Sequence, residues 1–249
     1  MIMHPQLQQV FDQGQVLKVI SGLNNFDPKR VAATIQAADR GGASFVDIAA
    51  APALVKLARE LTNLPICVSA VEPKQFVMAT QAGADLIEIG NFDSFYAQGR
   101  RFEAEEILAL TKETRSLLPD ITLSVTVPHI LQLDQQVELA EELVKAGADI
   151  IQTEGGTSSK PRSAGTLGLI EKAAPTLAAT YEISRVVTVP VLCASGLSNV
   201  TAPMAIAAGA KGVGVGSAIN QLGNEVAMVA AVRSLVEALA AVSPNRVKV

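Results

Sequence analysis

Short apolar runs rich in valine, isoleucine and leucine recur along the chain, and longer stretches with apolar residues at helical spacing separate them. Runs of the first kind, bounded by turn residues, indicate buried strands, whereas the second pattern indicates amphipathic helices. The predicted strands are 16–21, 45–49, 66–69, 86–89, 121–125, 150–153, 189–193 and 212–215. The predicted helices are 4–13, 28–40, 52–61, 73–82, 103–117, 133–146, 169–185, 202–210 and 224–241. This regular alternation predicts a parallel sheet covered by helices.

An internal repeat indicates that the sheet closes on itself. A Gly-Ala pair stands before each even-numbered strand from the second to the eighth, and a proline marks the entry to the third, fifth and seventh. The pairs begin at Gly42, Gly83, Gly147 and Gly209. The alternation divides the chain into four (βα)₂ quarters, while the unequal repeat lengths count against a solenoid. We therefore predict a single domain over residues 1–249, a (β/α)₈ TIM barrel whose N-terminal helix covers the bottom.

Composition agrees with this fold and excludes several functions. The 249 residues are 49% hydrophobic and 18% charged, which suits one large core, and the near absence of aromatic residues favours layers of aliphatic side chains. A net charge of −4 argues against nucleic acid as a partner. No membrane association is expected, because residues 1–15 lack a signal-like apolar segment and Arg233 and Glu237 interrupt 226–242. Cys67 and Cys193, both in apolar runs, are predicted to be buried free thiols in a reducing compartment.

The ends of the last two strands carry the clearest chemical signal. Each strand runs into glycine and serine, and glycine lets the backbone approach a ligand closely. In (β/α)₈ barrels the loops after strands seven and eight commonly bind phosphate through backbone N–H groups. The predicted phosphate-binding residues are Ser195, Gly196, Leu197, Gly216 and Ser217, and we call them the phosphate corner.

Polar residues inside strands predict what faces the barrel lumen. Alignment on the Gly-Ala pairs places Asp47, Glu88 and Gln152 at equivalent positions, with apolar neighbours that suit the outer helices. Lys18 on the first strand belongs to the same inward set. Its amine could lose its proton and form an imine, act in proton transfer or hold an anion, or it could form a structural ion pair with Asp47 or Glu88. Asp47 and Glu88 are accordingly candidate acid–base groups, with the ion pair as the alternative.

Further candidates lie at the predicted mouth. Glu154 follows strand six and His129 follows strand five, so both are candidate catalytic residues, with simple exposure as the alternative. Lys160 and Arg162 lie in the long loop after strand six, where a lid would carry positive charge over an anion, with solvated charges at the loop tip as the alternative. No zinc-type spacing, Walker loop or serine elbow is present, so no metal site is predicted. The glycines of 212–216 lie at the last strand and do not open a dinucleotide-binding unit.

Two levels of family resemblance accompany these motifs. With S-G-L-S-N at 195–199 and V-G-V-G-S-A-I at 213–219, the chain resembles the ribulose-phosphate-binding barrel superfamily. K-V-I-S-G-L-N-N-F-D at 18–27, V-D-I-A-A at 46–50 and Q-T-E-G-G at 152–156 resemble the uncharacterised hypothetical chloroplast open reading frames of plastids and cyanobacteria. The resemblance implies a TIM-type fold in a cyanobacterial cytoplasm or plastid stroma, and it implies no activity. The superfamily's paired Asp-x-Lys strand motif has no equivalent here.

Three functions follow as hypotheses. The first is a phosphorylated-metabolite-binding barrel that acts as a lyase, aldolase or isomerase without a cofactor. The second is an oxidoreductase with FMN held at the same phosphate corner. The third is a non-catalytic metabolite-sensing or assembly protein, for which the alanine-rich outer helices would serve a homo-oligomer or partner interface.

Overall fold

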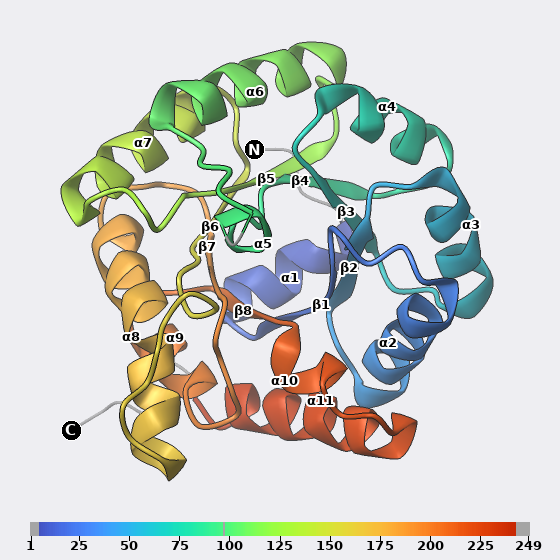
Figure 1. Cartoon of the computed structure of the whole chain (residues 1–249). Helices are drawn as coiled ribbons and strands as arrows, with labels where there is room; N and C mark the ends of the chain where they lie inside the picture. Colours follow the sequence, from blue (N-terminus) through green and yellow to red (C-terminus); the bar gives the residue numbers. More distant parts are fainter. Residues whose placement is uncertain (1–4, 97, 243–249) are drawn as a thin grey trace.

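The computed structural model describes residues 5–96 and 98–242 and contains a closed barrel of parallel strands in sequential order (Figure 1). The strands are β1 (Val16–Gly22), β2 (Phe45–Ala49), β3 (Ile66–Ala70), β4 (Leu86–Ile89), β5 (Thr122–Thr126), β6 (Ile150–Gln152), β7 (Val191–Ala194) and β8 (Gly212–Val215). The helices are α1 (Pro5–Gln13), α2 (Pro28–Gly41), α3 (Pro52–Leu61), α4 (Pro73–Gln81), α5 (Asp93–Tyr96), α6 (Ala104–Leu117), α7 (Leu133–Lys145), α8 (Gly165–Ser184), α9 (Ala202–Ala207), α10 (Ser217–Asn220) and α11 (Glu225–Ala240). Parallel pairing of β1 with β8 closes the ring and confirms the predicted (β/α)₈ barrel.

Helix boundaries follow the predicted local signals. Asp27 caps α2 by accepting a hydrogen bond from the Lys29 N–H at 2.9 Å, and Pro28 occupies the first helical position. Gly42 ends the same helix with a φ of 86°, a left-handed conformation that costs glycine little. The first residue of each of the other three Gly-Ala pairs also has a positive φ. The repeat therefore marks four helix ends, as the sequence predicts.

Several elements differ from the predicted ones, most of them by one residue at an end. β7 begins at Val191, two residues later than expected, because Pro190 has no N–H to donate to the sheet. α8 begins at Gly165, so the loop after β6 is shorter than predicted. The loop after β4 contains the short helix α5, which the hydrophobic pattern did not reveal. His4, the first residue of the predicted N-terminal helix, lies outside the described residues.

Two hydrophobic cores support the barrel. The larger lies between strands and outer helices and includes the neighbours predicted to face outward, among them Val46, Ile87 and Ile151. The smaller fills the bottom of the lumen, where Leu7 and Phe11 of α1 pack against the starts of the strands. Figure 1 shows α1 lying across the ring of strands, so the N-terminal helix covers the bottom as predicted.

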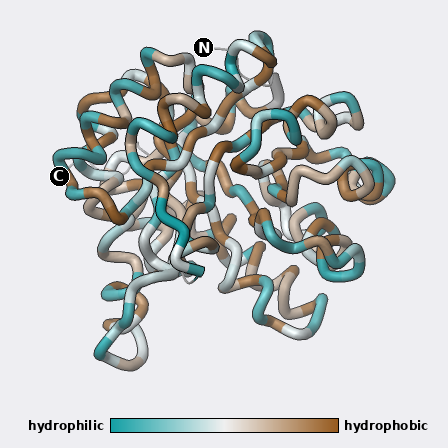
Figure 2. Tube along the Cα trace, turned by 45° about the horizontal axis from the view of Figure 1, so that its top comes forward, coloured by the Kyte–Doolittle hydropathy of each residue, from teal (hydrophilic) through white to brown (hydrophobic). Residues whose placement is uncertain are grey.

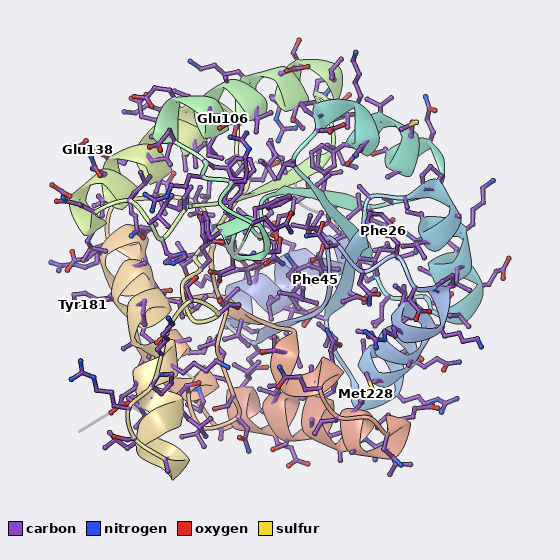
Figure 3. The ribbon with its side chains drawn as sticks, in the orientation of Figure 1. Phe26, Phe45, Glu106, Glu138, Tyr181 and Met228 are labelled. Carbon is purple, nitrogen blue, oxygen red and sulfur yellow. The ribbon has the colours of Figure 1, made fainter. Side chains whose placement is uncertain are left out.

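Colour by hydropathy shows the same arrangement. The central strands in Figure 2 are largely brown, while the surrounding helices alternate between brown and teal. Phe45, from the bottom layer of the lumen, lies near the centre in Figure 3, whereas Glu138 and Tyr181 lie on the outer helices. Cys67 and Cys193 are buried and unbridged, which confirms the predicted free thiols. This packing leaves the carboxyl ends of the strands as the open face.

Candidate functional site

The carboxyl ends of the strands surround a pocket of about 330 Å³. All five residues predicted to bind phosphate line it, three from the loop after β7 and two from the start of α10, directly after β8. Among the described residues, the N–H groups of Gly196, Leu197 and Ser217 have no hydrogen-bond acceptor. Unpaired N–H groups that converge on a pocket are the usual means of holding a phosphate dianion.

Glu154 connects this pocket to a buried polar cluster. Of the described residues that line the pocket, Glu154 alone has an ionisable side chain, and its residue is only 3% exposed. Its Oε1 accepts a hydrogen bond from the Tyr96 hydroxyl at 2.7 Å and lies 3.2 Å from His129 Nδ1. Its Oε2 accepts the N–H of Asp93 at 3.1 Å. The two predicted residues, His129 and Glu154, are therefore in direct contact.

Asp93 extends the cluster to the phosphate corner. Its Oδ2 accepts a hydrogen bond from the Ser195 hydroxyl at 2.6 Å, and its Oδ1 accepts one from the Ser158 hydroxyl at 2.8 Å. Oδ1 also lies 3.5 Å from His129 Nδ1. The loops that follow β4, β5, β6 and β7 thus meet at one carboxylate, and we call Asp93, Tyr96, His129, Glu154 and Ser195 the mouth cluster.

The mouth cluster shifts the titration of its members. Burial raises the pKa of Glu154 above its ordinary value, and the hydrogen bond from His129 only partly offsets this effect. For His129, burial alone would lower the pKa, but the hydrogen bond and negative charge of Glu154, with the charge of Asp93, raise it above the ordinary 6.5. Burial and the neighbouring Glu154 raise the pKa of Tyr96, which stays a hydrogen-bond donor. A carboxyl group with a raised pKa at a pocket wall is suited to proton transfer.

The inward-facing polar residues of the strands form a second, separate set. Lys18 donates hydrogen bonds to Glu88 Oε2 at 2.6 Å and to Gln152 Oε1 at 3.0 Å, and Asp47 Oδ2 lies 3.8 Å from its ammonium. We call these four residues the lumen quartet. Lys18, Asp47 and Glu88 have no solvent exposure and do not line the pocket, whereas Gln152 does. The side chain of Gln152 therefore stands between the pocket and the Lys18 ammonium.

The lumen quartet has the character of a buried ion pair. Burial alone would lower the pKa of Lys18, but the carboxylates of Asp47 and Glu88 outweigh it and raise that pKa above its ordinary value. The amine is accordingly held as an ammonium, the opposite of what imine formation requires. Burial raises the pKa of Asp47 to about 6, against the attraction of Lys18. Asp47 Oδ2 is also a buried oxygen without a hydrogen-bond donor among the described residues.

Asn91 joins the pocket to a larger neighbouring cavity. That cavity measures about 700 Å³, lies between the loop after β1 and helices α2 and α11, and shares Ser21, Gly22, Asn91 and Asn220 with the phosphate pocket. Asn91 has a φ of 71°, and no hydrogen bond to its side-chain amide is found among the described residues. The two cavities therefore adjoin at Asn91.

The predicted lid residues lie away from both cavities. Lys160 and Arg162 are exposed and line neither one. Glu171 of α8 fixes their loop by accepting the N–H groups of Arg162 at 2.7 Å and of Ser163 at 3.0 Å. Closure of this loop over a ligand stays a prediction.

Sequence reasoning missed Asp93, Tyr96 and Asn91. All three belong to the loop after β4. The available signal was an aspartate and an asparagine directly after a strand end, the position from which barrels supply site residues.

Three ligand atoms in the mouth cluster are close enough for a metal ion. One donor atom from each of Asp93, His129 and Glu154 lies within 4.8 Å of the others. These atoms already take part in hydrogen bonds to one another and to Tyr96, Ser158 and Ser195. That the site holds no metal stays a prediction.

Fold and pocket together define the chain as a (β/α)₈ barrel with a polar site at the carboxyl ends of its strands. No helix among the described residues has the length and apolar character needed to cross a membrane. The chain belongs to a family of proteins of unknown function (DUF561), whose model matches residues 3–245.

Two curated relatives carry the name uncharacterized protein ycf23, which agrees with the resemblance to hypothetical chloroplast open reading frames. The relative from Cyanophora paradoxa is 48% identical over 228 residues, covering 91% of this chain and 93% of its own length. The relative from Porphyra purpurea is 40% identical over 245 residues, covering 98% of this chain and 91% of its own length.

Solved structures share the fold at low sequence identity. A 3-hexulose-6-phosphate synthase aligns with a TM-score of 0.63 and 16% identity, covering 90% of this chain and 99% of its own. An (S)-3-O-geranylgeranylglyceryl phosphate synthase from Thermoplasma acidophilum, solved with its substrate sn-glycerol-1-phosphate, aligns with a TM-score of 0.61 and 13% identity, covering 94% and 96% of the two chains. These likenesses support the fold.

Proposed function

We propose that this barrel binds a phosphorylated small metabolite and, as a lyase, aldolase or isomerase, moves a proton on it through Glu154. One observation carries the proposal: the five residues predicted to hold phosphate line a single pocket in which Glu154 is the one ionisable side chain among the described residues. The neighbours that act on phosphorylated compounds have the same fold. The ligand's phosphate would occupy the corner formed by Gly196, Leu197 and Ser217.

Glu154 and His129 have complementary roles in this proposal. The Glu154 carboxylate removes a proton from the carbon beside a carbonyl, and its raised pKa makes it a stronger base than an exposed glutamate. His129 Nδ1 lies 3.2 Å from Oε1, so a protonated imidazole would stabilise the carboxylate form of Glu154. Tyr96 fixes the carboxyl group by its hydrogen bond to Oε1. Lys18, Asp47 and Glu88 are not required to touch the ligand, and their catalytic roles stay untested predictions.

Deuterium exchange tests the proposed chemistry. The protein is incubated in D₂O with a panel of aldose and ketose phosphates, and label at the carbon beside the carbonyl is measured by mass spectrometry. Wild type is expected to catalyse exchange with at least one compound, and Glu154→Gln is expected to lose about 100-fold or more of that rate. Glu138→Gln, a change of the same kind on the exposed surface of α7, is the matched control. Phosphate binding without exchange would favour the metabolite-sensing alternative.

Flavin mononucleotide is the second candidate ligand, and the cavity of about 700 Å³ beside the phosphate corner favours it. Its ring system would lie past Asn91, and its electron-transfer chemistry would come from the cofactor. The purified protein, mixed with FMN and desalted, would then keep a yellow colour in stoichiometric amount. A colourless protein after desalting would exclude this candidate.

We infer that the protein works in a cyanobacterial cytoplasm or a plastid stroma. The support is its similarity to the ycf23 relatives and its buried free cysteines. Immunodetection in fractionated cells would test this, and recovery with washed membranes would contradict it.

A further inference from the structure

The phosphate corner contains a backbone strain that its glycines do not explain. Ser195 has a φ of 74°, a left-handed conformation that disfavours any residue with a Cβ. Ser195 and Asn91 are the non-glycine residues with positive φ in the described chain, and both line the phosphate pocket. Strain of this kind persists only where surrounding contacts enforce it, and it concentrates at functional sites.

The contacts that enforce the conformation of Ser195 come from two directions. Its hydroxyl donates to Asp93 Oδ2 at 2.6 Å and accepts the N–H of Thr157 at 2.8 Å. The preceding carbonyl, that of Ala194, accepts the Thr176 hydroxyl at 2.6 Å. Hydrogen bonds therefore fix both the side chain of Ser195 and the peptide group before it, and the buried carboxylate of Asp93 supplies the charged contact.

The turn at Ser195 determines where the next two amides point. Gly196 also has a φ of 74°, and the consecutive left-handed residues turn the N–H groups of Gly196 and Leu197 away from any protein acceptor. Were Ser195 to relax to a negative φ, the direction of these amides would change with it. Gly156 packs directly against the Ser195 carbonyl and leaves no room for a Cβ, so the turn is also enclosed from outside.

We propose that Asp93 of α5 is a positioning residue that holds Ser195 in its left-handed conformation and thereby aims the Gly196 and Leu197 amides at the ligand's phosphate. The inference rests on the proposed function and adds a role for the loop after β4 in anion binding. Asp93 does not touch the phosphate itself, because it is buried and does not line the pocket.

A double-mutant cycle with inorganic phosphate as the probe tests this role. Asp93→Ala removes the acceptor, whereas Ser195→Gly removes both the donor and the cost of the left-handed conformation. We expect Asp93→Ala to raise the Kd for phosphate about tenfold, which corresponds to 1.4 kcal/mol. We expect Ser195→Gly to raise it less, and the double variant to bind as Ser195→Gly does, because glycine needs no enforcement.

Matched variants separate positioning from general damage. Ser158→Ala removes another hydrogen bond to Asp93 without touching Ser195, so its Kd should stay within about twofold of wild type. Asp93→Asn keeps an acceptor oxygen and should restore most of the affinity lost in Asp93→Ala. Amide chemical shifts of Gly196 and Leu197 should move in Asp93→Ala and stay near wild type in Asp93→Asn.

Two failures are distinguishable. A wild-type protein that binds no phosphate at millimolar concentrations would overturn the proposed function and this inference with it. A wild-type protein that binds phosphate, while the effects of Asp93→Ala and Ser195→Gly multiply independently, would overturn the role of Asp93 alone.

Discussion

The lumen quartet and the mouth cluster are built from similar groups and do different things. Each contains two buried carboxylates and one basic side chain, and in each the acid and the base are in direct contact, at 2.6 Å in the quartet and 3.2 Å in the mouth cluster. In the quartet the base is a lysine held as an ammonium below the pocket, and no charged member of the quartet lines the pocket. In the mouth cluster the base is a histidine, and Glu154 forms part of the pocket wall.

Height along the barrel axis accounts for the difference. Lys18, Asp47 and Glu88 point inward one layer above the apolar floor, where neighbouring side chains close over them. Glu154 comes after the end of β6, one layer higher, and lines the pocket although it is only 3% exposed. An inward-facing polar residue is therefore a candidate for stability or for chemistry according to its layer. Each expectation below would break or sharpen this division.

The largest expected effect is on stability, from Lys18→Met. Removal of the ammonium leaves two carboxylates buried without compensation, which typically costs about 3–5 kcal/mol of unfolding free energy. Denaturant unfolding measures the loss, and Lys56→Met on the exposed side of α3 is the control. The double variant Lys18→Met with Glu88→Gln should recover part of the loss. A stable Lys18→Met protein that has lost phosphate binding would reverse the assignment of the two regions.

The next effect concerns pH and Asp47. Its folded-state pKa of about 6 lies above the ordinary 3.8, so the folded protein binds the proton more tightly and loses stability as pH rises through this interval. Asp47→Asn keeps the uncharged form at every pH. We compare the unfolding free energy of the variant with that of wild type at each pH. The difference in favour of the variant should be larger at about pH 8 than at about pH 4, by roughly 2–3 kcal/mol. Equal differences at both pH values, measured by denaturant unfolding, would contradict a buried, destabilised carboxylate.

Gly156→Ala probes the mouth without changing any charge. A Cβ at this position would collide with the Ser195 carbonyl and the Gly196 backbone, so the phosphate corner must shift. We expect phosphate affinity to fall about tenfold or more, which corresponds to about 1.4 kcal/mol or more of binding free energy. Gly223→Ala, where a Cβ meets open space, is the control. Titration calorimetry gives the Kd, and unchanged affinity in Gly156→Ala would remove the corner from the binding site.

The smallest expected effect is on the titration of His129. Glu154 raises the pKa of His129 through a hydrogen bond and its negative charge. Glu154→Gln should lower that pKa, because it removes the negative charge that favours the protonated imidazole. An NMR titration of the imidazole protons measures it, and a His4→Gln variant assigns the signal because the chain has two histidines. An unchanged pKa of His129 would mean that Glu154 and His129 do not interact electrostatically in solution.

The sequence predicted the barrel and the inward-facing set because both depend on periodic patterns. Gly-Ala pairs mark helix ends, and parity along a strand assigns each side chain to the lumen or the outer helices. Parity does not report depth, so for Lys18 it left both chemistry on a ligand and a structural ion pair open. The distinction needed the packing of Gln152 above it.

The mouth cluster was only half predictable for a different physical reason. Glu154 and His129 follow strand ends and could be found by position alone. Asp93 lies on a one-turn helix too short to show a hydrophobic period, and its partner Ser195 lies 102 positions further along the chain. The left-handed conformation of Ser195 follows from that contact, so no local rule predicts it.

The N-terminal helix α1 also limits how a ligand can enter and leave the site. Leu7 and Phe11 close the lower end of the barrel, so among the described residues the pocket lies on the side of the strand carboxyl ends. A ligand reaches it there or through the adjoining cavity of about 700 Å³. If the proposed lyase reaction cleaves such a ligand, the product without the phosphate would leave before the phosphorylated product, which the backbone amides still hold.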